Sequence, residues 1–183
     1  MSIDYNELAQ VIYEQNKAVG WWDDPNRCIY QTLQLVSTEV AEATEGERKH
    51  LNDDHLLWRA MGEVELADAL IRLLDVGARY QWDYNKGALQ PHRLLRGRKI
   101  TTIGGQHLVI NVALADLAVA IYDGFNRDQI SKAYTVCIET ILRIAEDASY
   151  DIMGALEEKL EYNKKRADHK RENRQGKPGQ KAF

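Results

Sequence analysis

Apolar residues recur along the chain at intervals of three and four, the spacing that places side chains on one face of an α-helix. Leu8, Val11 and Ile12 follow this spacing near the N-terminus. Gly46 suits the end of one helix, and Asp151 suits the N-cap of another. The predicted helices cover about residues 4–20, 27–45, 57–80, 106–122, 128–148 and 151–166.

The same pattern predicts the fold class. No segment shows the alternation of a convincing strand, and only 3 prolines interrupt the 183 residues. We expect an all-α helical bundle built from antiparallel helix pairs. One domain would span residues 1–166, with a helical hairpin at 106–148, and a basic tail would follow at 167–183. Residues 83–105 are expected to be irregular or to hold short helical turns.

Two pairs of acids interrupt the apolar faces of the predicted helices. Glu39 and Glu42 occupy one such face in the sequence "QLVSTEVAEATE", and Glu65 and Asp68 occupy another, flanked by apolar residues. Glu42 and Glu65 share a midpoint with Glu39 and Asp68, between residues 53 and 54. An antiparallel hairpin folded there would place the four carboxylates at one height between two helices.

Four adjacent carboxylates require compensation by protons or cations. Two unit charges ~4 Å apart repel by about 4 kcal/mol at an effective dielectric near 20. Carboxylate oxygens at this density suit Mg²⁺ or Mn²⁺. The alternative is a solvated face with i,i+4 ion pairs, for which Asp68 and Arg72 qualify. Three further acids, Glu45, Glu47 and Glu63, are expected on the solvated surface, and Asp75 is either a distal site residue or a partner of Arg72 or Arg79.

At these acids the sequence resembles the MazG-like all-α nucleoside triphosphate pyrophosphohydrolases, whose signature is E-x-x-E followed by E-x-x-D. Here the two parts are "EVAE" at 39–42 and "ELAD" at 65–68. The segments "NKAVGWWDDPN" and "ALEEKLEYNKKR" extend the resemblance. It implies Mg²⁺-dependent hydrolysis of a (d)NTP to (d)NMP and pyrophosphate, with purine triphosphates such as GTP and dGTP among the expected substrates. It also implies a bundle completed in a homodimer or homotetramer.

The resemblance assigns roles residue by residue. Glu39, Glu42, Glu65 and Asp68 match the metal-ligand positions. Lys159, Asn163 and Arg166 match the family's phosphate-binding positions, and they share one helical face at i, i+4 and i+7. The substrate base is expected near Trp22, Asn16 and Lys17. This chain departs from the family pattern after Arg166, where Ala167 and a longer insert precede Gly176 and Lys177, so the role of the tail is open.

Charge and composition shape the remaining expectations. The net charge of −4 divides into +6 for residues 164–181, which hold eight Lys or Arg against two acids, and therefore −10 for the rest. An acidic body disfavours duplex DNA, so no stable nucleic-acid partner is expected. The isolated cysteines, the start "MSIDYNELAQ" and the absence of an apolar run near ~20 residues favour a cytoplasmic protein without a membrane span.

Three other functions compete with hydrolysis. A di-iron carboxylate bundle needs Glu-x-x-His on two helices, and the sequence offers only Glu47 to His50. A helical regulatory or nucleic-acid-binding protein would use the basic tail. A purely structural bundle with a solvated acidic stripe would show no effect of divalent metals.

Overall fold

The computed structural model describes residues 3–96 and 100–166, and this part of the chain contains no β-strand. The prediction of an all-α fold is therefore confirmed. The predicted basic tail, 167–183, lies outside the described residues. The elements in chain order are α1 (Tyr5–Ala18), α2 (Ile29–Lys49), α3 (Met61–Arg79), the short 3-10 helices η1 (Tyr84–Lys86) and η2 (Arg93–Leu95), α4 (Ile103–Tyr122), α5 (Arg127–Asp147) and α6 (Ile152–Lys165).

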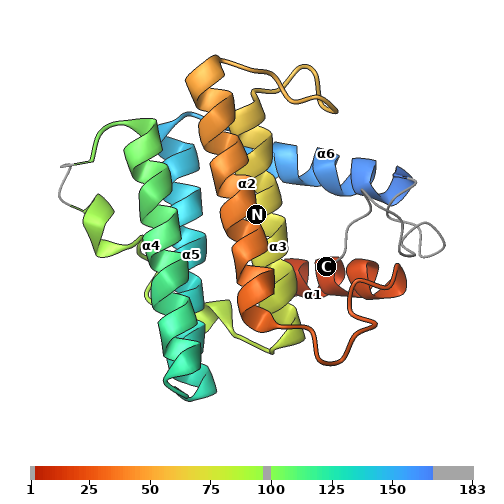
Figure 1. The fold of residues 1–183 in the computed structure, drawn as a ribbon, viewed down its shortest axis with the longest axis vertical. Helices are drawn as coiled ribbons and strands as arrows, with labels where there is room; N and C mark the ends of the chain where they lie inside the picture. The colour runs from red at the N-terminus through yellow and green to blue at the C-terminus, as the bar shows by residue number, and fades with distance from the viewer. Residues whose placement is uncertain (1–2, 97–99, 167–183) are drawn as a thin grey trace.

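The helices form two adjacent pairs and two crossing helices. In Figure 1, α2 and α3 run side by side at the centre, and α4 with α5 forms a second pair against them. On the opposite side, α1 and α6 lie across the direction of the central pair, and both contact α3. The region between α1, α6 and the α2–α3 pair is where most of the predicted site residues meet.

Helix α3 forms the centre of the core. Leu66, Leu70, Leu73 and Leu74 are fully buried, because α3 contacts α1, α2, α5 and α6 on its different sides. Burial of each such side chain contributes about 1.5–3 kcal/mol. A helix held on every side is a rigid support for the polar side chains that it carries.

Side-chain caps fix where several helices begin. The Asp4 carboxylate accepts hydrogen bonds from the backbone N–H groups of Asn6 and Glu7, and it starts α1. Asn126 and Gln129 form a reciprocal capping box at the start of α5. Asp151 accepts from the N–H of Gly154 and caps α6, as the sequence predicted.

Gly46 does not end α2, contrary to the sequence-based expectation. The helix continues to Lys49 and ends at His50, which adopts the left-handed conformation with φ 53°. Gly46 instead permits close approach of the next helix, since a Cβ there would lie 2.7 Å from the Cβ of Met61. The third helix also starts later than predicted, at Met61, so the connection between α2 and α3 is longer than a tight turn.

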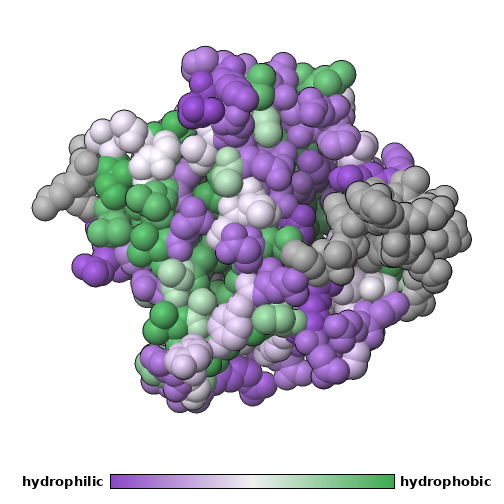
Figure 2. Space-filling model, viewed as in Figure 1, coloured by the Kyte–Doolittle hydropathy of each residue, from purple (hydrophilic) through white to green (hydrophobic). Residues whose placement is uncertain are grey.

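Helix α4 corrects another expectation, that no apolar stretch is long enough to span a membrane. Among the described residues, Ile103–Tyr122 passes that test by length and composition alone, which is weak evidence because core helices pass it too. Less than half of this helix is buried. Figure 2 shows apolar side chains gathered on the side of the molecule where α4 lies, and the exposed ones include Leu108, Val119 and Tyr122.

Candidate metal and nucleotide site

A cavity of about 410 Å³ lies between α1, α2, α3 and α6, and the predicted acids line it. It is of the size of small-molecule sites in proteins. Its walls combine carboxylates, cationic side chains and two indoles. The lining residues are Asn16, Trp21, Trp22, Arg27, Thr32, Leu35, Thr38, Glu39, Glu42, His55, Glu65, Asp68, Ile71, Arg72, Asp75, Lys159, Asn163 and Arg166.

Three of the four predicted ligands form a compact group. Glu39 and Glu42 on α2 and Glu65 on α3 each offer a carboxylate oxygen within 4.8 Å of the others. Glu39 and Glu65 are each 6% exposed, whereas Glu42 lies at the solvent side. The antiparallel α2–α3 hairpin thus brings together acids from two segments that are separated in sequence, as the shared midpoint indicated.

Asp68, the fourth predicted ligand, pairs with a lysine and lies outside the group of three. The Nζ atom of Lys159, on α6, lies 3.0 Å from Asp68 Oδ2 and 3.8 Å from Oδ2 of Asp53 in the α2–α3 connection. The Lys159 side chain is only 3% exposed. A buried ammonium group therefore links α6 to α3 and to the connection before it.

Burial and like charge raise the pKa values of the acids. Burial, followed by the charge of Asp68, raises the pKa of Glu65 to about 9. Burial and then the charge of Glu39 raise the pKa of Glu42. The pKa of Asp68 is also raised, mainly by burial, against the opposing effect of Lys159. These carboxyls therefore hold protons more strongly than ordinary acids, and a bound cation would favour their ionised forms.

Arg72 compensates one member of the group. Its Nε and Nη2 atoms both lie 2.5 Å from Oε1 of Glu39, which is nearly buried. The alternative pairing of Arg72 with Asp68 does not occur among the described ion pairs. Glu42 and Glu65 form no ion pair within the described residues. The acids without a built-in cation are thus adjacent, one on each helix.

The predicted phosphate-binding residues of α6 line the same cavity. Asn163 has a buried Oδ1 atom without a hydrogen-bond partner in the described part of the chain. Arg166 lies at the end of α6, with its guanidinium 5.6 Å from the centre of the Tyr162 ring. The Tyr162 ring also contacts that of His55, at 4.7 Å between centres. The cavity is therefore also lined by Lys159, which is paired with Asp68, by Arg166 and by the amide oxygen of Asn163.

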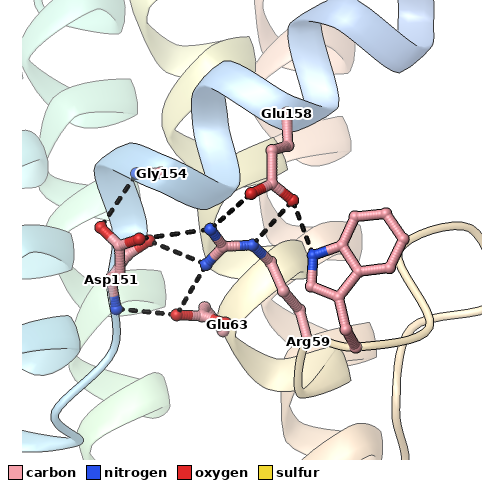
Figure 3. Close-up of polar contacts among 6 residues, drawn as sticks. Arg59, Glu63, Asp151, Gly154 and Glu158 are labelled. Atoms are coloured by element: carbon pink, nitrogen blue, oxygen red, sulfur yellow. Dashed lines mark hydrogen bonds and ion pairs between the residues drawn. The ribbon is translucent and has the colours of Figure 1, made fainter.

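A cluster around Arg59 anchors the first two turns of α6. The Arg59 guanidinium lies 3.2 Å from Asp151, 2.9 Å from Glu158 and 3.2 Å from Glu63 (Figure 3). Glu63 also accepts a hydrogen bond from the backbone N–H of Asp151 at 2.7 Å. The expectation that Glu63 is solvated is therefore wrong, since it is 9% exposed and joins α3 to α6.

The opposite end of the cavity contains Asp75, which is 8% exposed. Its carboxylate accepts hydrogen bonds from Nδ2 of Asn16 at 2.8 Å and from Nε1 of Trp22 at 2.9 Å. Asp75 is thus bound to α1 and to the segment after it, not to Arg72 or Arg79 by an ion pair. Burial raises its pKa to about 6, against the opposing effect of these two hydrogen bonds.

The structure brings Asn16 and Trp22 to the cavity but not Lys17. Lys17 lies over the ring of Tyr13 and near Glu14, and it is absent from the lining. Trp22 is 9% exposed, and the guanidinium groups of Arg27 and Arg79 lie 5.3 and 5.7 Å from its ring centre. Stacking of a base on Trp22 stays a prediction.

Several site residues were not predicted from the sequence. Arg27 and Asp53 carry no motif, because both act through contacts distant in sequence. Arg59 had one available signal, its i,i+4 spacing to Glu63. Its partners on α6 lie too far away in sequence to be predicted from the spacing of residues.

Comparison with known proteins adds no relative, since no family model, curated protein or solved structure matches the chain.

Proposed function

We propose that this protein is a divalent metal-dependent nucleoside triphosphate pyrophosphohydrolase, which converts a (d)NTP and water to (d)NMP and pyrophosphate. The observation that carries the proposal is the cavity itself. Three carboxylate oxygens lie within 4.8 Å of one another, and Lys159, Asn163 and Arg166 line the same space.

The donor set fits Mg²⁺, with Mn²⁺ as a substitute. Glu39, Glu42, Glu65 and Asp68 offer hard oxygen atoms, and no His or Cys belongs to the described acid cluster. Glu42 and Glu65 are adjacent and form no ion pair with a described residue, so a divalent ion would compensate their charges when both are ionised. A bound Mg²⁺ supplies positive charge to the phosphates and acidifies a water molecule.

The side chains of the chain itself would perform the remaining steps. Arg166 and Lys159 would bind phosphate oxygens, with the planar guanidinium forming a two-pronged contact. Glu42, on the solvent side with a raised pKa, is placed to accept the proton of the attacking water. The Arg59 cluster would keep α6 in position during this contact, because it ties Asp151 and Glu158 to α3.

Assembly into a homodimer or homotetramer is part of the proposal. Leu108, Val112, Ala115, Val119 and Tyr122 follow alternating intervals of four and three residues on α4. Leu108, Ala115, Val119 and Tyr122 are exposed, and Val112 is half-buried. Intervals of this kind form the apolar seam of paired helices. The alternative of a nucleic-acid-binding protein rests on residues 167–183, outside the described residues, and no described feature favours it.

The test is hydrolysis of the eight common (d)NTPs with Mg²⁺, with separation of monophosphate, diphosphate and pyrophosphate. The proposal expects equal amounts of monophosphate and pyrophosphate, abolished by EDTA. Glu42→Gln should be inactive, and Glu146→Gln, an exposed acid on α5, should match the wild type. Release of orthophosphate, or activity unaffected by EDTA, would contradict the proposal.

A further inference from the structure

Asp75 lies on the same helix as the acid cluster, at the far end of the cavity. It follows Asp68 by seven residues, so it shares the same face of α3 and lies about 10 Å further along the axis. Both residues line the cavity. If phosphates occupy the end with Glu39, Glu42 and Glu65, the Asp75 end receives the nucleoside.

The Asp75 carboxylate retains hydrogen-bonding capacity. One oxygen accepts from Asn16 and the other from Trp22, whereas an ionised carboxylate offers about four acceptor sites. No cationic side chain of the described residues forms an ion pair with it within 4.0 Å, although the charges of Arg27 and Arg72 are near enough to favour its ionised form by lowering its pKa. A buried carboxylate with no cation in direct contact is costly unless further donors reach it. One acceptor position on each oxygen is therefore available to a ligand with two adjacent N–H donors.

The walls around Asp75 suit a flat, aromatic ligand. The guanidinium of Arg27 lies 5.5 Å from the ring centre of Trp21 and 5.3 Å from that of Trp22, and it donates to the backbone carbonyl of Trp21. Leu35 and Ile71 add apolar surface to the same cavity. Planar bases bind between such groups by stacking and cation–π contact.

We infer that Asp75 selects guanine among the common bases by accepting hydrogen bonds from its N1–H and its 2-amino group. This inference rests on the proposed function. Guanine alone presents two adjacent donors on its Watson–Crick edge. Adenine and cytosine place a ring acceptor beside their amino group. Uracil and thymine flank their single N–H with carbonyl oxygens, which the carboxylate repels. Asn16 and Trp22 act as positioning residues, since they hold the Asp75 oxygens toward the cavity.

Substrate analogues test the inference without altering the protein. Inosine triphosphate lacks the 2-amino group, and 2-aminopurine riboside triphosphate lacks the N1–H. Each should lower kcat/KM by about ten- to a hundredfold relative to GTP, because each leaves an acceptor of Asp75 unpaired. ATP, which lacks both donors, should be worse than either. Values for the two analogues within twofold of GTP would overturn the inference.

Asp75→Asn provides the second test, since the amide replaces one acceptor with a donor. The ratio of kcat/KM for GTP over ATP should fall at least thirtyfold, and ATP hydrolysis should change less than threefold. An equal loss for all nucleotides would mean that Asp75 only supports the fold. Binding of GMP in EDTA, measured by calorimetry, gives a readout independent of catalysis. GMP should bind the wild type at least tenfold more tightly than IMP.

The outcomes separate the two hypotheses. If no nucleotide yields pyrophosphate but GMP still binds more tightly than IMP, the proposed reaction fails and the base preference of Asp75 stands. If several nucleotides yield pyrophosphate at similar rates, the reaction stands and the role of Asp75 fails. Glu146→Gln serves as the control, because it removes the same single negative charge at an exposed position on α5.

Discussion

The ammonium group of Lys159 lies 3.0 Å from the carboxylate of Asp68, in a setting that leaves only 3% of the lysine side chain exposed. The family resemblance implied a phosphate-binding role for Lys159 and a metal-binding role for Asp68. In the structure the two side chains form an ion pair with each other, so the buried carboxylate of Asp68 is compensated by a charge from α6. Under the proposed function, metal and substrate would have to compensate these two charges in its place.

Lys159→Met should lower the free energy of unfolding by about 3–5 kcal/mol, because removal of one member leaves Asp68 buried and uncompensated. The double variant Lys159→Met, Asp68→Leu should recover much of this loss. Urea unfolding of the four proteins of the cycle measures the coupling. Lys164→Met, on the exposed side of α6, should stay within about 0.5 kcal/mol of the wild type. Equal effects of Lys159→Met and Lys164→Met would contradict the buried pair.

Glu65→Gln should separate stability from activity. In EDTA the variant should unfold at the same or a higher temperature than the wild type, because glutamine is neutral without the proton that the buried Glu65 must bind on folding. Mg²⁺ should stabilise the wild type by about 2.7 kcal/mol at a hundredfold excess over its Kd. This gain should disappear in Glu65→Gln, and activity should fall at least a hundredfold. Thermal unfolding with and without Mg²⁺ checks the effect, and a variant that keeps the full Mg²⁺ gain would exclude Glu65 as a ligand.

The metal-free protein should lose stability as pH rises. The pKa of Glu65 is about 9 in the folded chain, above its ordinary value of 4.5, so the unfolded chain loses this proton first. The contribution of the Glu65 proton to the free energy of unfolding is complete below about pH 4.5 and is lost as pH rises toward 9. One proton gives at most about 1.4 kcal/mol per pH unit.

Urea unfolding in EDTA at pH 5.5, 7 and 8.5 measures this slope. The comparison with Glu65→Gln isolates the contribution of one carboxyl, since other titrating groups are common to both proteins. Addition of Mg²⁺ should flatten the slope of the wild type, because metal ligands must be ionised. Parallel slopes for the two proteins in EDTA would refute the assignment.

Arg166→Ala should impair catalysis more than folding. Arg166 lies at the end of α6 and contacts Tyr162, so the loss of stability should stay within about 0.5–1 kcal/mol. Loss of a charge-assisted phosphate contact should reduce kcat/KM by roughly ten- to a hundredfold. Lys165→Ala, an exposed neighbour, is the matched control. If both variants keep wild-type kinetics, another cation binds the phosphates, with Arg72 as the first candidate.

The exposed stripe of α4 should mediate assembly. Light scattering at micromolar concentration should give two or four times the chain mass of 21.0 kDa. Val119→Glu, at a site that is 57% exposed in the single chain, should shift the mass toward one chain. Asp123→Lys, at the end of the same helix, changes the charge outside the stripe and should leave the mass unchanged. A wild-type mass of one chain would refute assembly.

Much of the fold followed from local pattern. The sequence pattern located the six α-helices of the described residues, and Asp151 was recognisable as a cap because capping depends on neighbours within one turn. The end of α2 was harder to predict. Glycine often ends a helix, so the sequence alone predicts an end at Gly46, but the close contact with Met61 outweighs this preference of glycine. The intrinsic helix propensity of a residue is a weak predictor, because tertiary packing can override it.

The candidate site also contains residues whose positions could be predicted from the sequence and others whose positions could not. The sequence predicted that four acids would meet across the hairpin, and three of them, Glu39, Glu42 and Glu65, form one group, whereas Asp68 pairs with Lys159. The partners of Asp75 and the burial of Glu63 were not predictable, since both depend on helices that cross α3 far away in sequence. Sequence spacing predicts contacts within a hairpin, whereas crossing helices meet at points that only the assembled core determines.

The Arg59 cluster has a mechanical consequence. Together with the buried Lys159, it fastens α6 from Asp151 to the middle of the helix, whereas Arg166 lies seven residues beyond Lys159, or about 10 Å along the axis. The last two turns of the helix therefore extend beyond its anchored part. A bend of about 10° after Lys159 would move the tip by about 2 Å, enough to weaken a hydrogen bond made there, while the acids on α3 stay fixed. Residues far from the cavity, such as Trp58 beside Glu158, would then affect the position of Arg166 by changing how firmly the anchored part is held.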